Sequence, residues 1–167
     1  MSRPVPTGSP GTHIHHDVGA RRVNGASGAF EQRLNPPGDV RLLVLRLEEG
    51  GDPDPFATGV LDGCGALLAA LRDLLADAGT EQPNVALVVV CPEPVDRWTH
   101  AAEHATVEAV RGAMQSLTPE LGARARINVF VCRAEGDEDA LDAALRFVAS
   151  PGGSYVAGST FDLRVRP

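Results

Sequence analysis

The run from Val85 to Cys91, VALVVVC, constrains the fold more than any other part of the sequence. Every residue in it is apolar and most are β-branched. A strand without polar alternation is covered on both faces, which is typical of a parallel sheet between layers of helices. Ile127 to Cys132 (INVFVC) is a second run of this kind. The chain is therefore predicted to be an α/β protein.

Segments with helical spacing alternate with these strands. Apolar residues recur every three or four positions over 54–78, 96–121 and from Asp137 or Glu138 to 149. Further strands are predicted at Val40 to Leu47 and between Tyr155 and Val165. The predicted fold is a three-layer, Rossmann-like and mostly parallel sheet, truncated to about four strands and three main helices.

Residues 1–39 differ in composition from the rest. They are rich in Pro and Gly, carry few large apolar residues and show no sustained periodicity. Such a segment buries too little apolar area to offset its ordering entropy. We expect 1–39 to be a flexible or partner-contacting arm, and 40–167 to be the folded domain.

Charge and composition exclude several classes of function. The 167 residues carry a net charge of -7, which disfavours binding to nucleic acid. No apolar run is long enough to span a membrane, and no secretory signal is evident. We therefore expect a cytoplasmic protein whose cysteines are free thiols. All 15 basic residues are Arg, so chemistry that needs a catalytic Lys is excluded.

From Pro83 to Leu163 the sequence resembles the second half of a short-chain dehydrogenase/reductase (SDR). The resemblance lies in VALVVVC, in a helix ending AVRGAMQSLTPELG, in the strand ARINVFVC and in the closing motif. That motif is Val148-Ala149-Ser150 followed by Tyr155-Val156-Ala157-Gly158. The resemblance implies a Rossmann-like fold whose two long helices form the subunit interface of the family.

The residues that carry the family's chemistry are replaced. Cys91 stands where the family has Ser, Glu103 where it has the acid–base Tyr, and Val107 where it has Lys. Instead of a Gly-rich cofactor turn, 48–54 holds four carboxylates, which would repel a pyrophosphate. We expect a truncated, degenerate SDR, a pseudoenzyme that binds no cofactor.

The first functional hypothesis is a non-catalytic subunit. It would form a homodimer, or a hetero-oligomer with a full-length SDR-type ketoreductase, through the two long helices. The Arg-only, Ala-rich composition suggests a bacterial source and a role in specialised, polyketide-like biosynthesis. The predicted interface residues are the larger side chains along the two helices: Leu67, Leu71, Leu74, Trp98, Val110, Met114 and Leu117.

The alternative hypothesis is a cofactor-independent enzyme or a protein that binds a small ligand. It would use a crevice near Cys91 and Glu103, with His100 or His104 able to activate the thiol, although core packing for the cysteine and a polar helix face for the others are the simpler explanation. A metal site is a further alternative, with His13, His15 and Asp17 as ligands in the arm. A solvated tail is the simpler explanation of that cluster.

Overall fold

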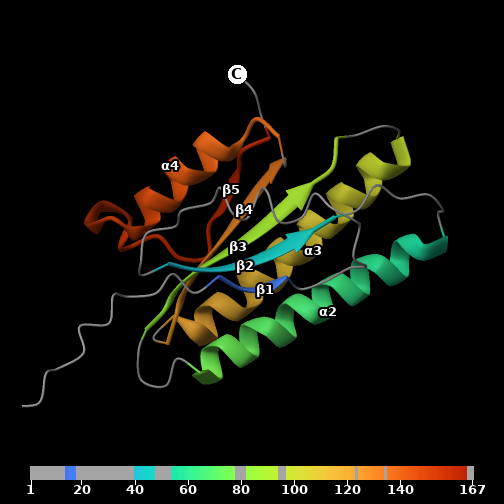
Figure 1. Ribbon diagram of the computed structural model, residues 1–167. Helices are drawn as coiled ribbons and strands as arrows, with labels where there is room; N and C mark the ends of the chain where they lie inside the picture. The colour runs from blue at the N-terminus through green and yellow to red at the C-terminus, as the bar shows by residue number, and fades with distance from the viewer. Residues whose placement is uncertain are drawn as a thin grey trace, which may run out of the picture.

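Parallel strands form one sheet, and their order across the sheet follows their order along the chain (Figure 1). The computed structural model describes residues 14–17, 40–47, 54–77, 82–93, 97–122, 124–133 and 135–164. In these residues the sheet has five strands, all paired in parallel. They are β1 (Ile14–Asp17), β2 (Val40–Arg46), β3 (Asn84–Cys91), β4 (Arg126–Arg133) and β5 (Thr160–Asp162).

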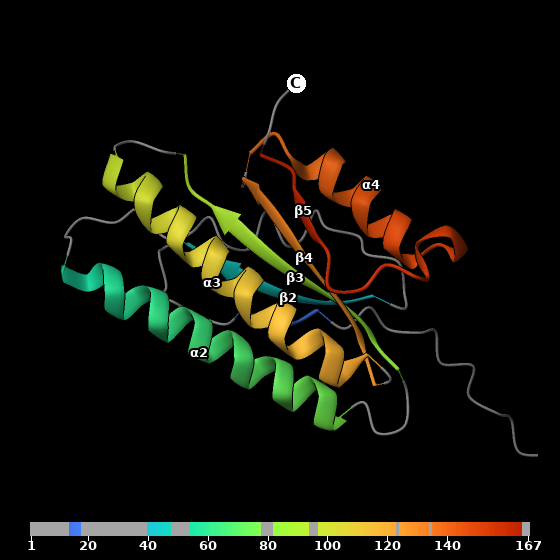
Figure 2. The ribbon, with the colours of Figure 1, turned by 180° about the vertical axis from the view of Figure 1, so that it is seen from behind.

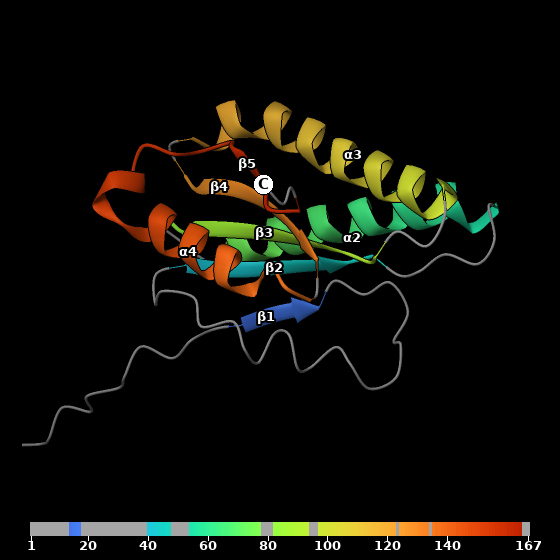
Figure 3. The ribbon, with the colours of Figure 1, turned by 90° about the horizontal axis from the view of Figure 1, so that it is seen from above.

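Helices cover both faces of the sheet. Figures 2 and 3 show α2 (Asp54–Asp77) and α3 (Arg97–Leu121) side by side on one face, and α4 (Glu138–Ala149) on the other. Successive strands are added to the sheet in one direction, but α4 lies on the opposite face from α2 and α3. The β4–α4–β5 connection therefore has the opposite handedness to the β2–α2–β3 and β3–α3–β4 connections. Within the described residues, none of the helices is long and apolar enough to cross a membrane.

The core is divided into two layers by β3, which is buried along its whole length. Leu87 and Val89 point towards α2 and α3, where they pack with Leu67, Val110 and other apolar side chains. Val88 and Val90 point the other way and pack beneath α4. Alternate residues of one strand thus serve opposite layers, which explains why VALVVVC contains no polar residue.

The predicted fold class is confirmed. The structure has four main parallel strands and three helices in three layers, and each predicted helix and strand has its counterpart. The short strand β1 is an addition: Ile14–Asp17, within the segment expected to be an arm, pairs with β2. The other residues of 1–39 lie outside the described part of the chain.

The closing motif of the sequence ends α4 and returns the chain to the sheet. Ser150 caps the 3-10 helix η1 (Pro151–Gly153) by accepting a hydrogen bond from the Gly153 amide. Gly158 has a positive φ of 71° and lies against Thr118 of α3. Both the backbone conformation and the close approach favour glycine at position 158.

Two adjacent glycines in η1 give a matched test of this packing. A Cβ at Gly153 would lie 2.1 Å from the Phe147 carbonyl oxygen, whereas at Gly152 the nearest atom is Ser150 Oγ at 3.6 Å. We expect Gly153→Ala to lower the free energy of unfolding by about 2 kcal/mol or more, because backbone must shift to admit the methyl group. Gly152→Ala should change it little. Urea denaturation of both variants measures the difference, and equal stabilities would contradict this account.

Candidate functional site

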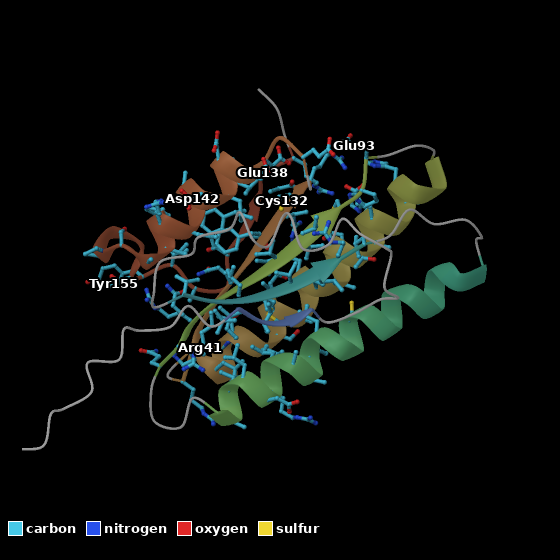
Figure 4. All side chains as sticks on the ribbon, in the orientation of Figure 1. Arg41, Glu93, Cys132, Glu138, Asp142 and Tyr155 are labelled. Carbon is cyan, nitrogen blue, oxygen red and sulfur yellow. The ribbon has the colours of Figure 1, made fainter. Side chains whose placement is uncertain are left out.

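The carboxyl ends of β3, β4 and β5 form the edge of the sheet where open α/β proteins place their ligands. Figure 4 shows Glu93, two residues after β3, at this edge. Tyr155, the sole tyrosine of the sequence, lies in the same figure at the other end of the molecule, beyond α4. It is 95% exposed, so the phenol takes no part in a site at the carboxyl edge.

A buried carboxylate, Glu103, faces this edge from α3. Its side chain is 1% exposed and forms ion pairs with two guanidinium groups. Arg164, two residues after β5, donates a short hydrogen bond to Glu103 Oε1. Arg133, the last residue of β4, places Nη2 3.7 Å from the same oxygen. The other oxygen, Oε2, is buried and has no hydrogen-bond partner.

Arg164 is held from its other side by Asp162. Arg164 Nε lies 2.8 Å from Asp162 Oδ1, and Nη2 lies 2.5 Å from Oδ2, so the pair is bidentate. The hydrogen bond from Arg164 is the largest cause of a lowered pKa for Asp162. Arg164 thereby joins a carboxylate on β5 to a carboxylate on α3.

Arg133 ties together the loops that follow β3 and β4. Its guanidinium donates a short hydrogen bond to the Pro92 carbonyl and lies 3.7 Å from Glu93. Its backbone amide donates to Asp137, the buried residue before α4, at 2.8 Å. The guanidinium groups of Arg133 and Arg164 are both paired with carboxylates or a carbonyl oxygen. Their positive charge is therefore neutralised within the protein and is not presented to an anion.

Cys91 lies beside this cluster as a buried thiol. Arg164 Nη1 is 3.8 Å from its sulfur, and the side chain is almost wholly covered. Burial, followed by the negative charge of Glu103, raises the pKa of Cys91 to about 12 despite the nearby arginines. Burial also raises the pKa of Cys132 to about 12. A thiol with such a pKa is protonated at neutral pH, which argues against a nucleophilic role.

The histidines do not join the thiol in the described structure. His100 and His104 are exposed on α3, where their rings meet edge to face with centroids 6.4 Å apart. In the part of the chain that the structure describes, neither is recorded with a hydrogen bond to Cys91. The structure therefore brings together Cys91 and Glu103, the first two residues of the alternative hypothesis, and leaves the histidines facing solvent.

The metal hypothesis for the arm is only partly covered by the structure. His13 lies outside the described residues, while His15 and Asp17 belong to β1. Among the residues that are described, no cluster of three or more His, Cys, Asp or Glu side chains forms a candidate metal site.

Four of the predicted interface residues lie in the core of the described structure. Leu67, Leu71, Val110 and Met114 are each at most 2% exposed, because they pack against the sheet. Leu74 and Leu117 are half-buried against the same core, and Trp98 belongs to α3 with its side chain outside the described residues. One sheet is sufficient to cover the apolar stripes of α2 and α3, so these stripes are core and not a docking surface.

Sequence reasoning missed Arg133 and Arg164. Each follows a strand at its carboxyl end, a position that places a polar side chain at the ligand edge of a parallel sheet. Their position at the carboxyl ends of strands is the sequence signal that could have identified them. Their pairing with Glu103 depends on which helix lies over which strand, and the sequence does not contain that information directly.

Comparison with known proteins supports the fold class. No protein-family model matches the chain, and no curated protein matches its sequence. The structure nevertheless has the Rossmann-like fold of short-chain dehydrogenases/reductases.

One solved structure with this likeness is BdcA (YjgI) from E. coli, an SDR-family protein. The match has a TM-score of 0.50 at 18% sequence identity and covers 74% of this chain. The chain spans 59% of the length of BdcA. At this identity the likeness describes the fold and carries no activity with it.

The Asp162–Arg164 pair predicts an acid-sensitive part of the stability. The folded-state pKa of Asp162 lies below its ordinary 3.8, so the pair contributes fully above that value and is lost as pH falls through the lower folded-state pKa. Asp162→Asn should therefore cost about 1 kcal/mol near neutral pH, and this cost should shrink as the pH falls through the folded-state pKa of Asp162.

Urea unfolding across this pH range measures the effect. Asp142→Asn is the matched control, because it removes a carboxylate whose partner Arg146, 2.7 Å away, is exposed on α4. A stability difference for Asp162→Asn that does not vary with pH would contradict the assignment.

Proposed function

We propose that this chain is a non-catalytic subunit with an SDR-like fold that pairs with a second copy of itself or with an active SDR-type ketoreductase. The outward faces of α2 and α3 would form the contact. The observation that carries the proposal is a pair of exposed helical glycines, Gly65 and Gly112, that have no neighbour within 4 Å to require them.

The outward faces of the two helices are lined by small side chains. They recur at intervals of three, four or seven residues and are exposed, unlike the leucines that face the sheet. The set is Gly65, Ala69 and Ala76 on α2, with Ala101, Ala105, Ala109, Gly112 and Ser116 on α3. Leu68 adds an exposed apolar side chain to the same region of α2. Small residues at helical spacing allow the backbones of two packed helices to approach closely.

Gly65 and Gly112 destabilise their helices, and no contact in the described part of the chain compensates for this. Glycine within a helix destabilises it by about 1 kcal/mol relative to alanine. At Gly153 and Gly158 a neighbouring group explains the absence of a Cβ, whereas at Gly65 and Gly112 the surroundings are open. A partner helix packed against Gly65 and Gly112 would explain why these two positions lack a Cβ.

The contents of the carboxyl edge support the non-catalytic part of the proposal. Cys91 and Val107, which replace the family's Ser and Lys, are buried, and Glu103 in the Tyr position is engaged by two arginines. No acid–base pair with access to solvent arises from these groups. In the described structure the residues at the family's catalytic positions are buried, so we favour the pairing role over the second hypothesis, a cofactor-independent enzyme or ligand-binding protein.

The pathway in which such a subunit would act is proposed from composition. An Arg-only, Ala-rich chain is typical of GC-rich bacterial genomes, and specialised, polyketide-like biosynthesis is the setting we propose. Within that setting the subunit would stabilise or tune an active reductase.

Gly112→Arg tests the pairing directly. In a paired subunit the long cationic side chain would block close approach, so the mass measured by light scattering should fall to that of one chain. In a free monomer the same change would simply strengthen α3 by about 1 kcal/mol and leave the mass unaltered.

Ala143→Arg is the control, because Ala143 is exposed on α4 at the opposite face of the sheet. It should leave the mass unchanged. The heteromeric case is measured by co-purification with a co-expressed SDR-type ketoreductase. A wild-type chain that is monomeric and retains no reductase would overturn the proposal.

The cofactor expectation has its own measurement. Titration calorimetry with NADH and NADPH should give no saturable heat, because the segment 48–54 carries four carboxylates in place of a Gly-rich turn, and these would repel a pyrophosphate. Stoichiometric binding of either nucleotide by the isolated subunit would contradict the non-catalytic assignment.

A further inference from the structure

We propose that Arg164, Asp162 and Glu103 form a latch that holds β5 and the residues just after it against α3. Release of this latch would open the carboxyl edge locally and expose Glu103 and Cys91 while the rest of the fold stays intact. The latch lies at the carboxyl edge of the sheet and not on the outward faces of α2 and α3. The proposal therefore does not depend on pairing.

The strand that carries the latch is the least secured of the main strands. β5 has three residues, all half-buried, whereas β3 and β4 have eight residues each and are almost wholly buried. β5 also stands last in the order of the sheet, next to β4 alone. Short, partly exposed edge elements open at a smaller free-energy cost than central ones.

Three kinds of contact hold β5 and the residues that follow it. Phe161 stacks on Phe130 of β4 with ring centroids 5.0 Å apart, and the Leu163 amide donates to the Val131 carbonyl at 2.8 Å. Both of these link β5 to its neighbouring strand. The bond from Arg164 to Glu103 instead joins the segment to the helix layer, and it therefore decides whether the edge is covered.

The latch is sensitive to the loss of a single partner. Without the Arg164 guanidinium, Glu103 would keep only Arg133 at 3.7 Å, and its Oε2 is already unpartnered. A buried carboxylate deprived of its counter-charge is strongly destabilised unless water reaches it. Opening of the edge admits that water, so removal of Arg164 favours the open form.

The cysteines provide a built-in measure of opening. Cys91 lies 3.8 Å from Arg164 and becomes reachable when the latch releases. Cys132 lies in the other layer of the core, and Phe161 and Leu163 pack against the same cluster, so its labelling also reports release of β5. Exchange of the β3 amides, measured alongside, separates this local opening from global unfolding.

The test is thiol labelling by a maleimide in the Cys64→Ser background, read by mass spectrometry of the peptides. Arg164→Gln should raise the labelling rate of Cys91 by about tenfold to a hundredfold, the range expected for loss of a charged hydrogen bond. The exchange rates of the β3 amides should not change. Adding millimolar guanidinium ion should restore part of the protection by refilling the site beside Glu103.

Arg146→Gln is the matched control, because it removes the same charge from an exposed pair on α4. It should leave the Cys91 labelling rate and the β3 exchange rates as in the parent. Two outcomes would overturn the proposal: a Cys91 rate in Arg164→Gln equal to that of the parent, or a rise at Cys91 matched by an equal rise in exchange of the β3 amides.

Amide hydrogen exchange of the unmodified chain provides a test that does not depend on the variant folding. The Leu163 amide should exchange well before the amides of β3, because β5 opens without the central strands. Exchange of Leu163 at the same rate as β3 would show that β5 opens only with global unfolding, and it would also overturn the latch.

Discussion

The burial of β3 on both faces is the constraint on which the rest of the structure depends. A central strand that exposes nothing requires apolar cover from two directions, and α2 and α3 supply it on one side while α4 supplies it on the other. The reversal of hand at the β4–α4–β5 connection follows from this need, because a third helix on the first face would leave Val88 and Val90 uncovered. The carboxyl ends of three strands then meet at one edge.

That edge carries charge where related folds carry catalytic groups. Buried ion pairs are stabilising only when their geometry and remaining hydrogen bonds offset desolvation. Here Arg164 is bidentate to Asp162 and also reaches Glu103, while Arg133 joins Glu103 to the loop after β3. The cluster closes the edge, and the same burial that packs it raises the pKa of the Cys91 thiol to about 12. Closure of the edge and protonation of the Cys91 thiol thus have one physical cause.

The two long helices separate their roles by face. Most of their larger apolar side chains belong to the core, and most of their exposed apolar positions hold small residues. The sequence pattern identified an apolar stripe but not what would cover it, since a sheet of the same chain and a second subunit both bury leucine equally well. The exposed glycines at 65 and 112 differ from Gly153 and Gly158, because no contact in the described part of the chain requires them.

The sequence by itself determined the fold class, the order of the elements and most of their boundaries, because continuous apolar strands and helical spacing are local signals. It also singled out Cys91 and Glu103, which the fold places beside one another. Only the tertiary structure decided their partners. Arg133 and Arg164 lie 30 and 61 positions from Glu103 in the sequence. The strand β1 was not predicted, because the HIHHD segment has no strand propensity. Contacts between residues so far apart depend on which helix lies over which strand, and that choice is made by packing of the whole chain rather than by any local pattern.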